Sequence, residues 1–196
     1  STFQRKQSIF VRKEELNVIK DKAMDSDFLF TVSEELKKIS SRSLSEFMNV
    51  IESGHKVFIY GNGGSAGIAS HVAIDLTKAL SKPCFTFTDP SLVTCFSNDF
   101  GFEQYVVECI RNFVSKDDVV ILMSSSGASP NVVNAAKFCA EKKISYLSLS
   151  GFSRDNPLSK LNCNGHFYIE SENYNIVETV HLLFLIAVIE KMRLKL

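Results

Sequence analysis

The chain has 196 residues, of which 45% are hydrophobic and 22% are charged, and this composition suits one α/β domain with a sizeable core. Its 22 Lys and Arg residues balance its 22 Asp and Glu residues, so no basic surplus points to nucleic acid as a direct partner. The one long apolar run, at residues 176–189, is interrupted by Glu178 and His181 and is too short to span a bilayer. The five cysteines lack zinc-type spacing. We therefore expect a cytoplasmic protein with reduced thiols and no membrane segment.

Residues 1–28 are rich in charge and lack a clear period, which predicts an N-terminal arm or helix. Apolar residues from Leu29 to Ile51 recur at helical spacing, so we expect an amphipathic helix or a broken pair that ends at Gly54. No linker, repeat or low-complexity tract follows. We therefore expect a single domain over residues 29–196.

From residue 57 onward, short apolar runs alternate with helical segments. We predict strands at residues 57–60, 84–87, 119–123, 144–149 and 166–169, and helices at residues 66–80, 90–114 with a break near 98–101, 130–140 and 176–192. Such alternation is typical of βαβ units. The sequence thus predicts an α/β fold, a Rossmann-like three-layer sandwich whose central parallel sheet is flanked by helices.

Two loops follow predicted strands and open predicted helices. The first is Gly61-Asn62-Gly63-Gly64-Ser65, and the second, residues 124–129, holds four serines in six residues. Glycines let backbone N–H groups approach an anion, hydroxyls add donors, and a helix N-terminus favours negative charge. Ligands of parallel sheets bind at these strand ends, so we expect a phosphate site there.

Each loop also has a simpler or rival interpretation. Serines are preferred helix caps in any protein, so the second loop could be a polar cap. The first loop matches a dinucleotide fingerprint at Gly61, Gly63 and Ala66, with Asp89 further along the chain. Neither loop contains the lysine of a nucleotide P-loop, so that class of phosphate site is excluded.

Four segments carry a family resemblance. They read IYGNGGS at residues 59–65, TDPS at 88–91, SNDFGFE at 97–103 and SSSGASPNV at 124–132. In order and spacing they resemble the phosphoheptose isomerases of the sugar isomerase (SIS) family, over the chain from about residue 30 to its end. The resemblance implies a SIS domain, a homotetramer with a shared active site, and sedoheptulose 7-phosphate or a related phosphosugar as substrate in surface-polysaccharide precursor synthesis.

The resemblance also implies roles for particular residues. Substrate contacts are implied for Asn62, Gly63, Gly64, Ser65, Asn98 and Asp99, and a grip on the phosphate for Ser124, Ser125, Ser126 and Ser129. His71 falls where the family has a zinc-binding histidine, and Asp75 where it has a glutamate that serves as ligand and acid/base. Because they stand four apart on a predicted helix, both residues face one side, as metal ligands or as a surface hydrogen-bonded pair.

The last helix departs from the family pattern, which has a glutamine, a histidine three residues later and a second histidine five beyond. Here these positions hold Glu178, His181 and Ile186, and isoleucine can neither bind zinc nor move a proton. We therefore take Asp75, Glu178 and His181 as candidate catalytic residues. The candidate zinc ligands are His71, Asp75 and Glu178. The alternative is that Glu178 and His181 form a polar stripe on a buried helix.

The leading functional hypothesis is an aldose–ketose isomerase that moves a proton between C1 and C2 of a sugar phosphate. A second is a non-catalytic SIS module that binds a sugar phosphate and acts through a protein partner such as DnaA. A third is a SIS enzyme for a nucleotide-sugar or capsule precursor. The final helix is apolar nearly all round, so it must be buried centrally or at a subunit contact, which predicts a homo-oligomer.

Overall fold

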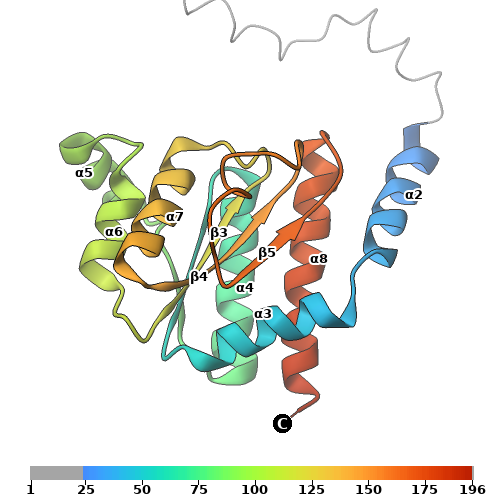
Figure 1. The fold of residues 1–196 in the computed structure, drawn as a ribbon, viewed down its shortest axis with the longest axis horizontal. Coiled ribbons are helices and arrows are strands. Elements are labelled where there is room, and N and C mark those ends of the chain that lie inside the picture. The colour runs from blue at the N-terminus through green and yellow to red at the C-terminus, as the bar shows by residue number, and fades with distance from the viewer. Residues whose placement is uncertain (1–23, 196) are drawn as a thin grey trace, which may run out of the picture.

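The protein is described by a computed structural model over residues 24–195. Five parallel strands form one sheet, flanked by helices on both faces (Figure 1). The strands are β1 (Val57–Gly61), β2 (Cys84–Thr86), β3 (Val119–Ser124), β4 (Ser145–Ser150) and β5 (Gly165–Tyr168). The helices are α2 (Met24–Lys37), α3 (Ser41–Ser53), α4 (Gly64–Leu80), α5 (Pro90–Phe100), α6 (Tyr105–Phe113), α7 (Pro130–Lys142) and α8 (Tyr174–Arg193).

Alternate residues of each strand point to opposite faces of the sheet and so feed two cores. Ile59 and Ile121 join a core with α3, α4 and α8 on one face. Phe58 and Val120 join a second core with α6 and α7 on the other face. The three-layer α/β prediction is confirmed, and α4 and α8 lie together on the first face (Figure 1).

The apolar pattern between Leu29 and Ile51 proves to be a broken pair of helices. The second helix, α3, begins where Ser40 Oγ accepts a hydrogen bond from the backbone N–H of Ser43 at 3.0 Å. Helix α2 already begins at Met24, before the expected boundary of the domain. Residues 1–23 of the predicted arm lie outside the described residues.

The strand order β2-β1-β3-β4-β5 places a switch point between β1 and β3. The chain leaves β1 for β2 on one side and returns to β3 on the other side of β1. At this kind of reversal the loops diverge and leave a crevice at the carboxyl ends of the strands. Gly61 pairs with Met123 in the register of β1 and β3, so the glycine loop and the serine loop lie side by side.

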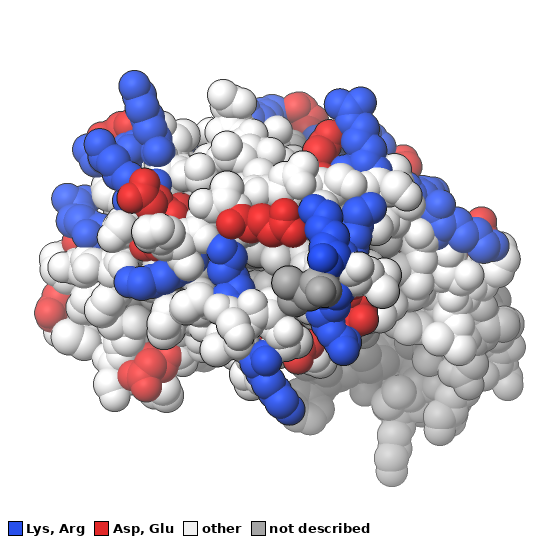
Figure 2. Space-filling model, turned by 90° about the horizontal axis from the view of Figure 1, so that it is seen from below, with Lys and Arg blue, Asp and Glu red and all other residues white. Residues whose placement is uncertain are grey.

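The surface of the described residues carries both signs of charge. In Figure 2, Lys and Arg side chains are interspersed with Asp and Glu side chains over the face seen from below. None of the helices in residues 24–195 combines the length and the apolar character needed to cross a membrane. All five cysteines are free.

Candidate active site

A small polar cavity opens at the switch point between β1 and β3. It has a volume of about 80 Å³ and is lined by Asn62, Ser65, Met123, Ser124, Ser125, Ser126, Ser129, Tyr174 and Glu178. Since a cavity needs roughly 10–15 Å³ by this measure to hold one water, the space suits a small polar group such as a phosphate. Six of the residues predicted to bind substrate or phosphate line this cavity. Glu178, predicted as a catalytic residue and metal ligand, lines it with them.

The serine loop is held in a tight turn beside this cavity. Gly127 has a φ of +65° and its N–H donates to the carbonyl of Ser124 at 2.8 Å. A side chain at position 127 would collide with the amide of Asn156, so the turn needs a glycine for two reasons. The hydroxyl of Ser124 donates to that of Ser129 at 3.0 Å. Ser129 precedes α7 without capping it through its side chain, so a helix cap does not explain this serine.

The glycine loop packs closely on the neighbouring strand. At Gly61 a side chain would meet the Cβ atom of Ser65 and the carbonyl of Met123. Gly63 has a φ of 54° and starts α4 with no side-chain cap. The first N–H groups of a helix have no partner inside the helix, so this uncapped end favours an anion.

Glu178 reaches the cavity from the first half of α8. Its Oε1 accepts a hydrogen bond from Ser125 Oγ at 3.5 Å. Its carboxylate also occupies the space where a side chain at Gly64 would stand. The carboxylate thus lies between the serine loop and the start of α4.

His181 lies away from the cavity, inside the core. It is fully buried, and its Nε2–H donates to the carbonyl of Ser150 at 3.3 Å. Burial lowers the pKa of its imidazole to about 4, so the ring is neutral at pH 7. Its Nδ1 has no hydrogen-bond partner among the described residues. His181 therefore supports the end of β4, and it is not among the residues that line the cavity.

His71 and Asp75 form a pair on the surface of α4, with 3.1 Å between His71 Nε2 and Asp75 Oδ2. Their side chains are 52% and 39% exposed. Within residues 24–195 of one chain, no three His, Cys, Asp or Glu side chains are grouped so that they could hold a metal ion. The predicted zinc ligands His71, Asp75 and Glu178 are thus not brought together in a single chain.

Asn98 and Asp99 lie at the C-terminal end of α5, where Asn98 Nδ2 donates to Asp99 Oδ1 at 3.0 Å. Both are exposed and neither lines the serine cavity. Helix α5 has no buried residue within this chain. The structure therefore separates these two predicted contacts from the phosphate loops.

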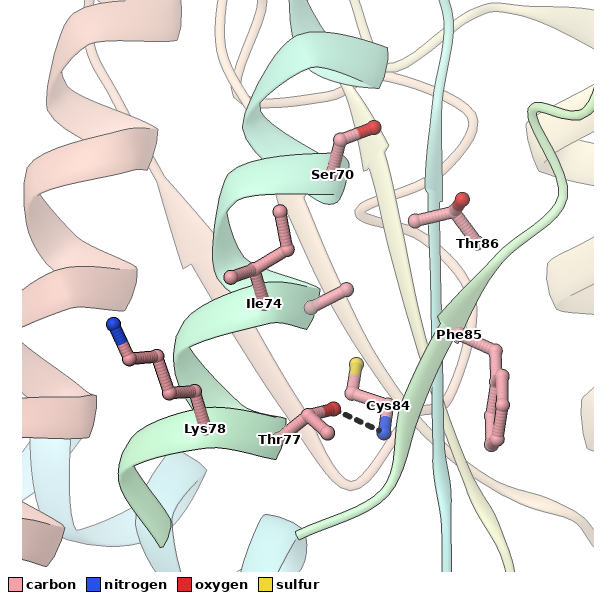
Figure 3. Close-up of a pocket in the computed structure, with 8 residues that line it drawn as sticks. Ser70, Ile74, Thr77, Lys78, Cys84, Phe85 and Thr86 are labelled. Atoms are coloured by element: carbon pink, nitrogen blue, oxygen red, sulfur yellow. Dashed lines mark hydrogen bonds between the residues drawn. The ribbon is translucent and has the colours of Figure 1, made fainter. Parts of the chain in front are cut away.

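A larger hollow of about 590 Å³ lies elsewhere, between α4 and edge strand β2 (Figure 3). Cys84 N–H donates to Thr77 Oγ1 at 3.1 Å there, and Ile74 and Phe85 are 62% and 49% exposed. Lys78 is the one charged residue among those that line it. We assign the functional site to the smaller cavity, because several hydroxyls and a carboxylate converge only in that one.

Sequence reasoning missed two residues that line the cavity, Met123 and Tyr174. Met123 lies in β3 directly before the serine loop, so its position follows once the strand is known. Tyr174 is the first residue of α8, and its ring packs edge-on against Phe152 with 4.8 Å between ring centroids. No sequence motif points to Tyr174, because the loop between β5 and α8 brings it to the cavity and the path of that loop could not be predicted.

Comparisons with known proteins agree with this architecture. The family model of the SIS domain matches residues 26–151. The phosphoheptose isomerase of Fusobacterium nucleatum is 31% identical over 166 residues, which cover 82% of this chain and 84% of the relative. A phosphoheptose isomerase of Campylobacter jejuni is 30% identical over 177 residues, covering 87% of this chain and 94% of the relative.

Solved structures show the same fold. The phosphoheptose isomerase GmhA from Neisseria gonorrhoeae superposes with a TM-score of 0.78 at 23% identity, covering 85% of this chain and 96% of that chain. A phosphoheptose isomerase from Francisella tularensis superposes with a TM-score of 0.76 at 21% identity, covering 90% and 96%. The solved structures confirm the fold, and the matched family model and the relatives confirm the resemblance found in the sequence. The chain belongs to the SIS-domain family and, within it, to the group of the phosphoheptose isomerases.

Proposed function

We propose that this protein is an aldose–ketose isomerase that acts on sedoheptulose 7-phosphate or a closely related phosphosugar. The observation that carries the proposal is the serine-lined cavity at the switch point, with a carboxylate on its wall. Relatives about 30% identical over most of the chain are named phosphoheptose isomerases, which favours this function over a non-catalytic binding module.

The phosphate is proposed to bind among the hydroxyls of Ser124, Ser125, Ser126 and Ser129. Neutral hydroxyl donors and the N-terminal ends of α4 and α7 supply the attraction, because the cavity wall carries no lysine or arginine. A cavity of about 80 Å³ leaves no room for the carbon chain. The sugar is therefore proposed to extend outward past Gly63 and Gly64.

Glu178 is the proposed acid–base group. A carboxylate close to a phosphate repels it, so the phosphate lies toward the serines and the carboxylate faces the carbon chain. Glu178 would take a proton from C1 of the ketose and return it to C2, while a proton moves between the two oxygens through an enediol. Asp75 and His181 stay candidates from the sequence resemblance, and no step is assigned to a metal.

A homo-oligomer, tetrameric as the resemblance implies, is part of the proposal. Its support is the apolar surface of one chain, with Ile74 and Phe85 exposed beside an edge strand and α5 without a buried residue. Isolated patches of this kind favour contact with another protein surface.

Proton NMR in D₂O tests the isomerase function directly. The purified protein is mixed with sedoheptulose 7-phosphate, and an enediol mechanism exchanges deuterium into C1 or C2 as an aldose phosphate forms. The matched control is Glu178→Gln, which keeps the shape of the side chain but cannot take a proton. If wild-type protein bound the sugar phosphate without forming an aldose or exchanging deuterium, isomerisation of this substrate would be refuted.

A further inference from the structure

A buried chain of hydrogen bonds runs from the start of α7 to the wall of the serine cavity. It begins at the backbone N–H of Val132, which donates to Asn131 Oδ1 at 3.0 Å. Asn131 is 1% exposed and Tyr60, at the end of β1, is 2% exposed. This series of hydrogen bonds ends at Asn62, which lines the cavity. Because a backbone N–H can only donate, the oxygen of Asn131 must face Val132, and this fixes the orientation of that amide.

The fixed amide of Asn131 uses its whole hydrogen-bonding capacity. Its Nδ2 donates to the hydroxyl of Tyr60 at 3.0 Å and to Asn62 Oδ1 at 2.9 Å. Its Oδ1 also accepts from Asn62 Nδ2 at 3.0 Å. A side-chain amide has two N–H donors and two acceptor lone pairs, and all four are satisfied here.

Counting the hydrogen bonds of the Asn62 side-chain amide in the same way leaves one of its N–H groups free. Its Oδ1 accepts from Asn131 and from the hydroxyl of Tyr60, so both lone pairs are used. Burial raises the pKa of Tyr60, which keeps the hydroxyl protonated and able to donate. Only one N–H of Asn62 is used, in the bond to Asn131. The amide therefore has a single N–H left for the cavity and no free acceptor.

We propose that Tyr60 and Asn131 are positioning residues that hold Asn62 as a hydrogen-bond donor toward the phosphate-bearing ligand. A flipped amide would instead turn oxygen lone pairs toward an anion, which repels it. The inference rests on the proposed function only in that the ligand carries a phosphate. It adds to the serine hydroxyls one N–H donor whose orientation is set by Asn131 at the start of α7.

The first test compares two tyrosine variants by calorimetric titration with inorganic phosphate. Tyr60→Phe removes the donor to Asn62, and we expect the dissociation constant to rise about 3- to 10-fold, the loss of one hydrogen bond. Tyr146→Phe is the matched control, because Tyr146 is also 2% exposed in a strand and donates to the distant carbonyl of Asn162. It should leave phosphate affinity unchanged. Equal affinities for the two variants would overturn the inference.

A double variant tests whether Tyr60 acts through Asn62. In Asn62→Ala, the donor is gone, so adding Tyr60→Phe should weaken phosphate binding no further. Independent, additive losses would show that Tyr60 affects the cavity by another route and would refute the positioning role. Urea unfolding of each variant supplies the folded baseline against which the affinities are read.

Binding and turnover separate this inference from the proposed function. If phosphate affinity falls as expected while sedoheptulose 7-phosphate is not isomerised, the positioning role stands and the isomerase function fails. If turnover is observed but Tyr60→Phe and Tyr146→Phe bind phosphate alike, the positioning role fails alone. A wild-type protein that binds no inorganic phosphate would overturn the positioning role, while turnover alone decides the isomerase function.

Discussion

Glu178 occupies the space that a side chain at position 64 would need. Its carboxylate lies against the backbone of Gly64 at the start of α4, and Ser125 Oγ donates to it from the other side at 3.5 Å. Segments more than fifty residues apart thus fix one carboxylate at the cavity. The glycine is needed here for close approach, since its φ is not in the left-handed region.

Replacing Gly64 by alanine should therefore displace Glu178 without harming the fold. Gly64 is the first residue of α4 and its φ is not in the left-handed region, so alanine can adopt its backbone conformation and thermal stability should be kept. Turnover of sedoheptulose 7-phosphate should fall at least roughly 10-fold, because a small shift of a catalytic group costs that much or more. Gly67→Ala is the control, as a side chain there meets nothing within 4 Å. Full activity in Gly64→Ala would contradict the role of Glu178.

The charge of Glu178 should separate catalysis from binding. Glu178→Gln removes the base but also removes a negative charge from the phosphate cavity. We expect kcat to fall on the order of 10²- to 10⁴-fold, as for other general bases. Affinity for inorganic phosphate should be equal or higher. Steady-state kinetics measures kcat, and calorimetry measures the phosphate affinity. A weaker phosphate affinity with unchanged kcat would show that Glu178 is not the acid–base group.

Ser124 should support phosphate affinity. It lines the cavity, and its single O–H donates to Ser129, so its removal loses a polar group from the cavity wall and the hydrogen bond that holds Ser129 in place. We expect Ser124→Ala to weaken inorganic phosphate binding roughly 5- to 20-fold, the loss of one or two hydrogen bonds. Ser70→Ala is the control, because Ser70 lies on the exposed side of α4 and bonds only to the carbonyl of Ala66. Equal affinities of the two variants would argue against a phosphate in this cavity.

The parts of the site that follow from local chemistry could be predicted from the sequence. Ser124 ends the buried strand β3 and Asn62 directly follows the buried strand β1, and the parallel sheet then brings their loops together. The role of Asn131 could not be found in this way, because its partners at Tyr60 and Asn62 are about seventy residues away. The sequence also could not show that His181 turns into the core while Glu178, three residues earlier on α8, reaches the cavity.

The apolar surface between α4 and β2 should be buried in an oligomer. Ile74 is exposed there in a single chain, on α4 beside the edge strand β2 (Figure 3). Ile74→Glu should reduce the molar mass measured by light scattering after size exclusion. Lys137→Glu, at an exposed position of α7, should not change it. An unchanged mass in Ile74→Glu would place the contact elsewhere.

The buried imidazole of His181 should make the protein less stable in acid. Its pKa is about 4 in the folded chain and near 6.5 when unfolded, so below pH 6.5 the unfolded state binds a proton that the folded state excludes. The contribution of His181 to the free energy of unfolding should therefore be complete above pH 6.5. It should fall by on the order of 3 kcal/mol as the pH drops to 4. Urea unfolding at several pH values measures this slope.

His181→Leu should flatten that slope, although the loss of the donor to the Ser150 carbonyl lowers stability at pH 7. The slope should not vanish, because burial also lowers the pKa of His166 to about 4. If His181→Leu kept the full slope, the acid sensitivity would belong to other groups, and His181 would not be held neutral by its burial.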